Sequence, residues 1–177
     1  MNHTEIPDGP VPMSLLPDSA QVGPRGELQI AGLSVDELAA EYGTPLFIYD
    51  EQHLRSRCRE ARNALGEGTA YASKAFLCTA MARLVNEEGL HIDVASEGEL
   101  LTAIAAGIPG ERIVFHGNNK SLTELLAART HAVGRVVVDS FDELSRLQHL
   151  HEIDGLCLLY TSDAADEGLG VDLGGRR

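Results

Sequence analysis

Four short apolar segments recur along residues 69–139 at a nearly constant interval, and this rhythm constrains the fold more than any other feature. The segments begin at residues 69, 91, 112 and 135, and each is followed by a stretch with helical apolar spacing. Strands that alternate with helices at a short period are joined by right-handed crossovers into a parallel sheet. The sequence therefore predicts an α/β fold with four strands, at Thr69–Ala75, His91–Ala95, Arg112–His116 and Arg135–Asp139.

Capping patterns predict where the helices begin. A serine followed three residues later by a glutamate opens a helix by satisfying its first backbone N–H groups. The pattern occurs at Ser34/Glu37, Ser96/Glu99, Ser121/Glu124 and Ser140/Glu143. The period alone leaves open whether the sheet closes into a barrel or forms an open doubly wound sheet. The first strand is not followed by GxGxxG, which disfavours a dinucleotide-binding fold.

The region before this repeat reads as a lead-in. Five of the seven prolines lie within residues 1–26, which predicts a flexible, proline-rich arm. A strand is expected within Glu27–Leu33, and a second at Pro45–Tyr49 with proline at its first position, where a missing N–H is tolerated. Asp50 is placed to cap a charged helix, Glu51–Leu65, and Gly43 to end the helix that begins at Ser34.

Composition excludes several classes of partner. The chain has 177 residues, and its 27 Asp and Glu against 14 Lys and Arg give a net charge of −13. Nucleic acids and anionic membranes attract basic surfaces, so neither is an expected partner. No apolar run reaches the ~18 residues of a transmembrane helix.

Cysteine usage and the N-terminus point to a reducing compartment. Cys58, Cys78 and Cys157 are odd in number and widely spaced, and they form neither a disulfide framework nor a zinc site. The first residues lack the basic and then apolar pattern of a signal peptide. We therefore expect a cytoplasmic protein whose Cys58 and Cys78 pack as small apolar residues in helices.

One lysine stands inside an apolar run, Tyr71-Ala72-Ser73-Lys74-Ala75-Phe76. A lysine in such a run either reaches water or is used chemically. Burial would disfavour the ammonium form, lower the pKa and free the amine as a nucleophile toward carbonyls. Lys74 is therefore the first candidate for a catalytic residue.

With these segments placed, the chain resembles the N-terminal part of the diaminopimelate decarboxylases, pyridoxal-phosphate enzymes of the alanine-racemase-like barrel class. Five stretches carry the resemblance, in order and at matching separations across residues 33–150. They are Gly43-Thr-Pro-Leu-Phe-Ile-Tyr-Asp50, Tyr71-Ala-Ser-Lys-Ala-Phe76, His91-Ile-Asp-Val-Ala-Ser-Glu-Gly-Glu99, His116-Gly-Asn-Asn-Lys-Ser121 and Val136-Val-Val-Asp-Ser140.

The resemblance implies roles for five residues. Lys74 would hold pyridoxal 5'-phosphate as a Schiff base, and Ala72 would lie beneath the cofactor on the same strand. Asp93, Glu99 and His116 match positions that line the cofactor pocket. For Glu99 a structural role as the helix-capping partner of Ser96 is equally open. His116 could also be an ordinary loop histidine whose hydrogen bonds are satisfied.

No metal site is expected. His149 and His151 are two residues apart near a helix end, so they would not share a helical face as ligands at i and i+4 do.

The end of the chain departs from the family. Residues 156–177 resemble translated sequencing-adapter read-through, although residues 156–160 could form a strand and Gly168-Leu-Gly170 a phosphate-binding turn. The predicted organisation is an arm at 1–26, a strand and lead-in at 27–50, part of a (β/α)8 barrel with about four βα units at 51–155, and a non-native tail at 156–177. The second β-domain of the family would be absent, and we expect a truncated, inactive fragment.

The resemblance implies an activity for the parent protein. It would remove CO2 from meso-diaminopimelate to give L-lysine, and it would act as a homodimer on a small amino acid. Two alternatives stay open: a sister decarboxylase acting on ornithine or arginine, and a barrel that carries pyridoxal phosphate without catalysis.

Overall fold

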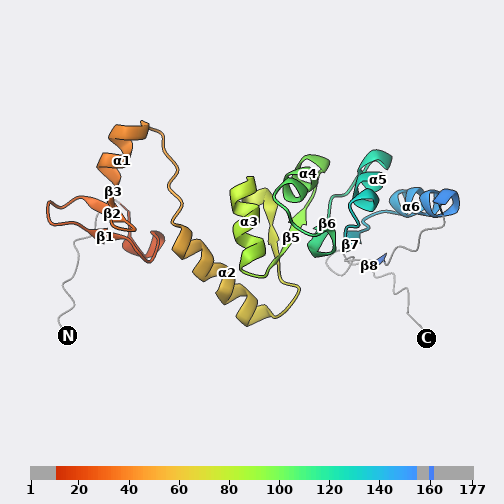
Figure 1. Cartoon of the computed structure of the whole chain (residues 1–177), viewed down its shortest axis with the longest axis horizontal. Helices are drawn as coiled ribbons and strands as arrows, with labels where there is room; N and C mark the ends of the chain where they lie inside the picture. The colour runs from red at the N-terminus through yellow and green to blue at the C-terminus, as the bar shows by residue number, and fades with distance from the viewer. Residues whose placement is uncertain (1–10, 155–159, 162–177) are drawn as a thin grey trace. The chain divides into compact units, whose positions relative to one another are not determined.

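The computed structural model describes residues 11–154 and 160–161, and the chain divides into two compact units, 1–59 and 60–177 (Figure 1). Within the described ranges, no helix is both long and apolar enough to cross a membrane.

The first unit contains a small antiparallel sheet. A short 3-10 turn, η1 (Met13–Leu15), precedes β1 (Gln21–Val22), β2 (Leu28–Ile30) and β3 (Leu33–Ser34), which pair in that order. The expected single strand over Glu27–Leu33 is instead a hairpin, because Ala31 and Gly32 both take positive φ and turn the chain back. The pairing of Gln21 and Val22 also lies inside the range predicted to be an arm.

Helix α1 (Val35–Tyr42) follows the hairpin directly, as its capping pattern predicts. The hydroxyl of Ser34 accepts the Glu37 N–H at 3.4 Å, and Gly43 ends the helix with φ of +81°. Glycine suits this position because it tolerates positive φ.

The strand predicted at Pro45–Tyr49 is not present. These residues follow a cis Thr44–Pro45 peptide bond and join no sheet. The apolar side chains of Leu46 and Phe47 are exposed. A strand is defined by its hydrogen-bonded neighbour, and no described segment pairs with this one. Asp50 does cap α2 (Glu51–Leu65), because its carboxylate accepts the His53 N–H at 3.1 Å.

The second unit is a parallel sheet whose strands pair in chain order. It comprises β4 (Ala70–Ala72), β5 (His91–Val94), β6 (Ile113–Phe115), β7 (Arg135–Val137) and β8 (Tyr160–Thr161). Helices α3 (Thr79–Glu87), α4 (Glu97–Ala105), α5 (Leu122–Thr130) and α6 (Phe141–Asp154) connect them, with 3-10 turns η2 (Ser73–Ala75) and η3 (Gly110–Arg112) (Figure 1). Unbroken chain order is the order of a barrel, whereas doubly wound sheets reverse direction at a switch point. The predicted partial barrel is thus confirmed.

The helices cover one face of this sheet. Ile92, Ile113, Val94, Phe115 and Val136 share that face through the parallel register and are almost completely buried. They pack with apolar side chains of the helices: Ala82, Leu100, Ala103, Leu125, Ala128, Leu147 and Leu150. The alternating residues Ala72, His91, Asp93, Val114 and Arg135 project to the opposite face.

Residues 160–161 extend the sheet into the range predicted to be a non-native tail. Tyr160 and Thr161 pair with Val136 and Val137. The rest of the predicted tail, with its possible Gly168–Gly170 turn, lies outside the described residues.

His91, at the amino end of β5, makes a testable contribution to acid sensitivity. Burial lowers the pKa of its imidazole below the ordinary value of 6.5, and the positive charges of Arg112 and Arg135 lower it further. A folded pKa below the unfolded one adds stability above about pH 6.5 that is lost as the pH falls through the folded value. We expect the unfolding free energy of His91→Gln to fall less than that of the wild type between pH 8 and pH 5 in urea titrations. Parallel curves for the two proteins would contradict this assignment.

Candidate functional site

The candidate residues gather at the carboxyl edge of the parallel sheet. Ala72 of β4 lies in register with Asp93 of β5, which in turn lies beside Val114 of β6. His116 directly follows β6, and its backbone N–H donates to the Val94 carbonyl at 2.7 Å. In barrels and parallel sheets, this edge is where ligands bind.

Lys74 lies just beyond the end of β4, in η2, and not inside the strand as predicted. The strand stops at Ala72 because Ser73–Ala75 curl into a 3-10 turn. Lys74 is exposed. Of the two outcomes open to a lysine in this run, the structure therefore shows access to water.

Next to Lys74, the Ser73 hydroxyl is buried and has no hydrogen-bond partner among the residues that the structure describes. Buried hydroxyls are nearly always paired, so an unpaired one commonly marks a strained or functional position.

Asp93 and His116 form a pair across β5 and β6. The Asp93 carboxylate contacts His116 Nδ1, and both side chains are partly exposed, at 23% and 37%. A carboxylate on one ring nitrogen fixes the orientation of an imidazole and leaves the other nitrogen available. The contact with Asp93 therefore satisfies Nδ1 of His116, as the alternative of an ordinary loop histidine requires, but it does not involve the other ring nitrogen.

Glu99 forms one half of the capping box that its pattern predicts. Its backbone N–H donates to Ser96 Oγ at 3.3 Å, and its carboxylate accepts the Ala95 N–H at 2.6 Å. Its carboxylate thus sits at the end of β5, one residue before the helix cap. At the start of α6 the Glu143 carboxylate likewise accepts an N–H from the residue before the cap serine, the Asp139 N–H at 3.2 Å. The complete reciprocal box occurs at Ser121/Glu124.

Gly117 sets the direction of the loop that follows His116. Its φ is +109°, and a Cβ added there would lie 2.9 Å from the Ala95 carbonyl oxygen. Other residues adopt this conformation only under strain.

We expect Gly117→Ala to lower the unfolding free energy by about 1–3 kcal/mol because of this strain and the close contact. Gly98→Ala in α4 is the matched control, since an added Cβ there meets nothing within 4 Å. Urea unfolding followed by circular dichroism measures both. Equal stability of the two variants would show that the Gly117 backbone is not restrained.

A fully buried ion pair lies behind the loop. The Nζ of Lys120 is 2.6 Å from Glu143 Oε1, and the side chains are 1% and 0% exposed. The same amine donates to the carbonyls of Gly117 at 2.5 Å and Val137 at 2.6 Å. It also lies 5.8 Å from the centre of the Phe115 ring.

Sequence reasoning missed this pair. In the sequence, Lys120 belongs only to a stretch that resembles the family, and Glu143 only to a helix-capping pattern. The signal that could have found it is the scarcity of lysine, because Lys74 and Lys120 are the chain's only two.

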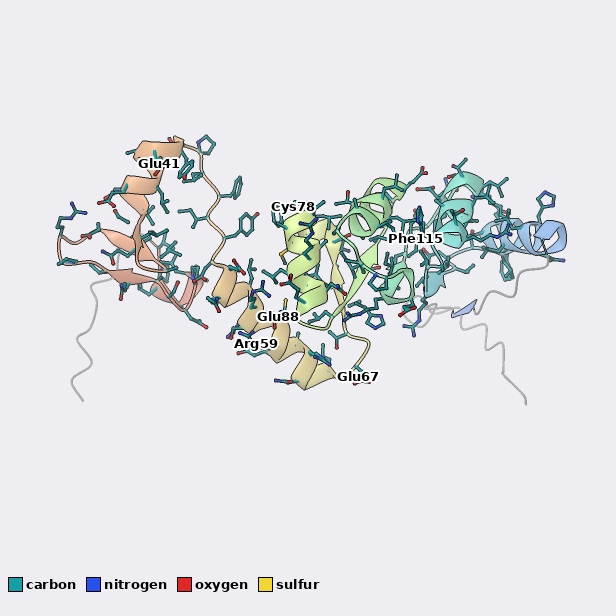
Figure 2. The ribbon with its side chains drawn as sticks, in the orientation of Figure 1. Glu41, Arg59, Glu67, Cys78, Glu88 and Phe115 are labelled. Carbon is teal, nitrogen blue, oxygen red and sulfur yellow. The ribbon has the colours of Figure 1, made fainter. Side chains whose placement is uncertain are left out.

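The two described cysteines differ. Cys58 is buried in α2, as predicted. Cys78 is not within a helix but precedes one: its sulfur accepts the Met81 N–H at 3.5 Å and caps α3 (Figure 2). The correction follows from its extended backbone, which is the conformation of an N-cap residue.

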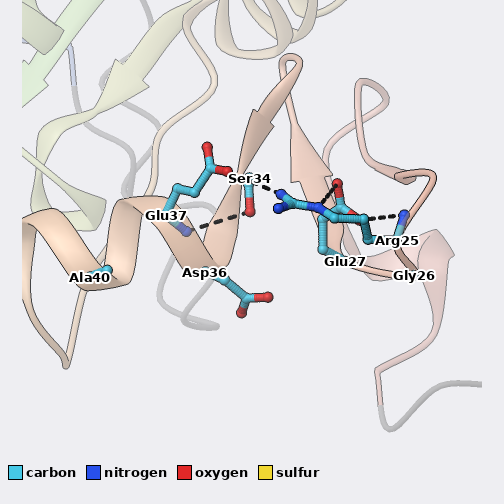
Figure 3. A pocket seen from close by; sticks show the side chains of 7 residues that line it. All are labelled: Arg25, Gly26, Glu27, Ser34, Asp36, Glu37 and Ala40. Atoms are coloured by element: carbon cyan, nitrogen blue, oxygen red, sulfur yellow. Dashed lines mark hydrogen bonds and ion pairs between the residues drawn. The ribbon is translucent and has the colours of Figure 1, made fainter.

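A separate pocket of about 460 Å³ lies in the first unit, between the β1–β2 turn and α1 (Figure 3). Arg25 Nη2 donates to Glu37 Oε1 at 3.0 Å, and the Arg25 N–H donates to Glu27 at 2.9 Å. Asp36 adds a third carboxylate to the lining. One guanidinium among three carboxylates does not suit an anionic ligand.

No group of three or more His, Cys, Asp and Glu residues is arranged to hold a metal ion in the part of the chain that the structure describes. His149 lies exposed on α6. The side chain of His151 is outside that part.

Curated relatives share close sequence similarity with this chain. A diaminopimelate decarboxylase of Mycobacterium bovis is 54% identical over 124 residues, which are 69% of this chain and 28% of the relative. That of Bacillus subtilis is 49% identical over 141 residues, 74% of this chain and 32% of the relative. The chain thus spans about a third of the length of these relatives.

Solved structures share the fold. The diaminopimelate decarboxylase from M. jannaschii in complex with L-lysine has a TM-score of 0.74 at 28% identity, covering 82% of this chain and 35% of that one. The Helicobacter pylori enzyme complexed with L-lysine has a TM-score of 0.65 at 26% identity, covering 72% and 33%.

The family match itself covers the whole parallel sheet. It runs over residues 51–170, from the start of α2 into the range predicted to be a tail. Together with the strand order and the residues gathered at the carboxyl edge, it shows that the chain belongs to the pyridoxal-dependent decarboxylases, as a member of their pyridoxal-binding domain family.

Proposed function

We propose that this chain is the cofactor-binding portion of a diaminopimelate decarboxylase and that Lys74 is the residue to which pyridoxal 5'-phosphate attaches. When bound, the cofactor supplies an aldehyde that captures amines and an electron sink that makes loss of a carboxylate feasible. One observation carries the proposal: the chain's only exposed lysine follows the first strand of the parallel sheet, beside the edge that bears Asp93 and His116.

The described residues fit such a cofactor in their chemistry. Lys74 supplies a primary amine in contact with water, which an aldehyde can reach. Ala72 presents only a methyl group next to Asp93 in the register, so it leaves room for a flat ring. The Ser73 hydroxyl, which has no hydrogen-bond partner within the described ranges, is a further polar group that a ligand could use.

In this proposal Asp93 orients the His116 ring, and His116 faces the ligand. The Asp93 carboxylate contacts Nδ1 of His116 and so holds the ring at the edge of the sheet. The other nitrogen, Nε2, is then the atom that faces a ligand and that exchanges a proton with it. Glu99 contributes indirectly, because its carboxylate fixes the Ala95 backbone at the end of β5.

The helices that follow β5 and β6 are poor phosphate sites. Glu99 and Glu124 place carboxylates at the starts of α4 and α5, where an anion would otherwise bind the free N–H groups. The hydrogen bond from the Ser121 N–H lowers the pKa of Glu124, so that carboxylate stays ionised. We propose that the cofactor's phosphate is held by other parts of the longer protein.

Borohydride trapping tests the attachment. The 177-residue chain is mixed with pyridoxal 5'-phosphate, reduced and digested, and we expect the added mass on the peptide that contains Lys74. Lys120 is an internal control, because it is buried and its amine is engaged by three oxygens. Lys74→Arg should remove the label. A label confined to Lys120 or to the Met1 amino group would refute the assignment.

Substrate choice needs a longer protein. We propose meso-diaminopimelate as substrate and L-lysine as product; the support is that relatives at 46–54% identity are named diaminopimelate decarboxylases. A hybrid in which this chain replaces the aligned segment of the Bacillus subtilis relative should release CO2 from meso-diaminopimelate and not from ornithine or arginine. Cofactor retention without any turnover would favour a carrier.

Two further features of the proposal concern the assembly and its surroundings. The full-length protein would form a homodimer, which sedimentation of the hybrid can measure. We propose that the protein works in a reducing compartment such as the cytoplasm, because its three cysteines are odd in number and widely spaced.

A further inference from the structure

We infer that Lys120 and Glu143 are positioning residues of the cofactor site, which hold the loop after β6 so that His116 stays on Asp93. This inference rests on the proposed function for its meaning in catalysis, and its structural part can be tested without cofactor.

The Lys120 amine is held by two hydrogen bonds and one ion pair. An ammonium group has three N–H donors and no acceptor. Three oxygens lie within 2.6 Å of Nζ: the Gly117 carbonyl, the Val137 carbonyl and Glu143 Oε1. The amine therefore joins the loop after β6, the end of β7 and the start of α6 at one buried point.

The loop that Lys120 holds begins immediately after His116. Gly117 directly follows His116, so the carbonyl that Lys120 holds belongs to the next residue after the imidazole. On its other side, Gly117 lies so close to the Ala95 carbonyl that a Cβ would be 2.9 Å from that oxygen. The His116 backbone is thus fixed from Lys120 behind it and from β5 beside it.

Helix α6 supplies a second restraint. Arg146 Nη1 donates to the Lys120 carbonyl at 2.6 Å and to Asn119 Oδ1 at 3.3 Å. Helix α6 therefore holds Asn119 and Lys120 through Glu143 and Arg146, and Lys120 in turn holds the Gly117 carbonyl. Such supporting contacts are what keep a functional side chain within the narrow geometry that it needs.

The buried Lys120–Glu143 pair places two charges where apolar side chains could also pack. A buried ion pair is weak support for stability, since apolar residues of similar volume often serve as well. Apolar residues at 120 and 143 would, however, remove the Lys120 donor from the carbonyls of Gly117 and Val137. The pair is therefore better explained by the geometry it imposes on the loop than by the stability it adds.

The test measures the reactivity of His116 toward diethyl pyrocarbonate in the 177-residue chain, by mass spectrometry of peptides. In the double variant Lys120→Met/Glu143→Leu, we expect His116 to react roughly tenfold faster, the factor that corresponds to loss of a contact worth about 1.4 kcal/mol. The exposed His149 provides the reference rate in every sample.

Two controls separate positioning from general loosening. Leu147→Ala removes a buried side chain from the same helix without touching the charges, and His116 reactivity should not change in it. Glu143→Gln removes the charge with little change in shape, and it provides the measurement if the double variant does not fold.

The inference is overturned if His116 reacts at the wild-type rate in the double variant or Glu143→Gln, or equally fast in Leu147→Ala. Borohydride labelling of Lys74 in the same variants reports on the proposed function separately. Absence of label in the wild type would count against the cofactor assignment, while the His116 rates would still decide the positioning role.

Discussion

Replacing Lys120 by methionine should lower the unfolding free energy of the chain by about 3–5 kcal/mol, because the change leaves a buried, uncompensated carboxylate at Glu143. Both side chains are almost completely inaccessible, so water cannot solvate the orphaned charge. The carbonyls of Gly117 and Val137 also lose their donor, which adds to the loss. Urea unfolding followed by circular dichroism gives the difference directly.

Two companion variants make this result specific. The double variant Lys120→Met/Glu143→Leu should regain most of the lost stability, since no charge then remains buried. Arg55→Met breaks the pair with the exposed Glu51 carboxylate and should change the free energy by less than about 1 kcal/mol. If Lys120→Met and Arg55→Met lower the unfolding free energy by equally small amounts, then water solvates the Glu143 carboxylate and the prediction is wrong.

Removing the Phe115 ring should have an effect of similar size by a different route. Phe115 is fully buried between the sheet and its helices, and Phe115→Ala should cost about 3–5 kcal/mol through lost apolar contact and the cavity left behind (Figure 2). Phe141 is the matched control, because it is 73% exposed. Phe141→Ala should stay within about 0.5 kcal/mol of the wild type.

The two sites should also be coupled. The Lys120 amine lies 5.8 Å from the centre of the Phe115 ring, so each change alters the surroundings of the other residue. The free-energy change of Phe115→Ala/Lys120→Met should therefore differ from the sum of the single changes by about 0.5 kcal/mol or more. An additive result would mean that the ring and the amine act independently.

Local patterns in the sequence predicted most of the parallel sheet and its helix starts. Each strand of the repeat formed within its predicted range, and the serines at 96, 121 and 140 all accept a hydrogen bond from the glutamate three residues later. These features succeed because they depend on neighbours a few residues apart.

Features that need a distant partner were not predictable in this way. Pro45–Tyr49 has the composition of a strand, but strand formation depends on a neighbour that the segment itself does not encode. The Lys120–Glu143 pair joins residues 23 positions apart, through a loop whose path depends on Gly117. For the same reason, the sequence could not tell that Lys74 would lie in a turn beyond its strand.

The second face of the parallel sheet has a consequence for any segment that comes to lie on it. His91, Asp93 and Arg135 project from that face, and Arg135 is exposed. An apolar segment on this face would desolvate these groups without offering hydrogen bonds in return. The free-energy cost of that desolvation is substantial for polar side chains and larger for charged ones. A segment that covers this face must therefore supply hydrogen-bond acceptors for the Arg135 guanidinium and a partner for the His91 imidazole. The interior between that segment and the sheet will contain polar contacts at these positions.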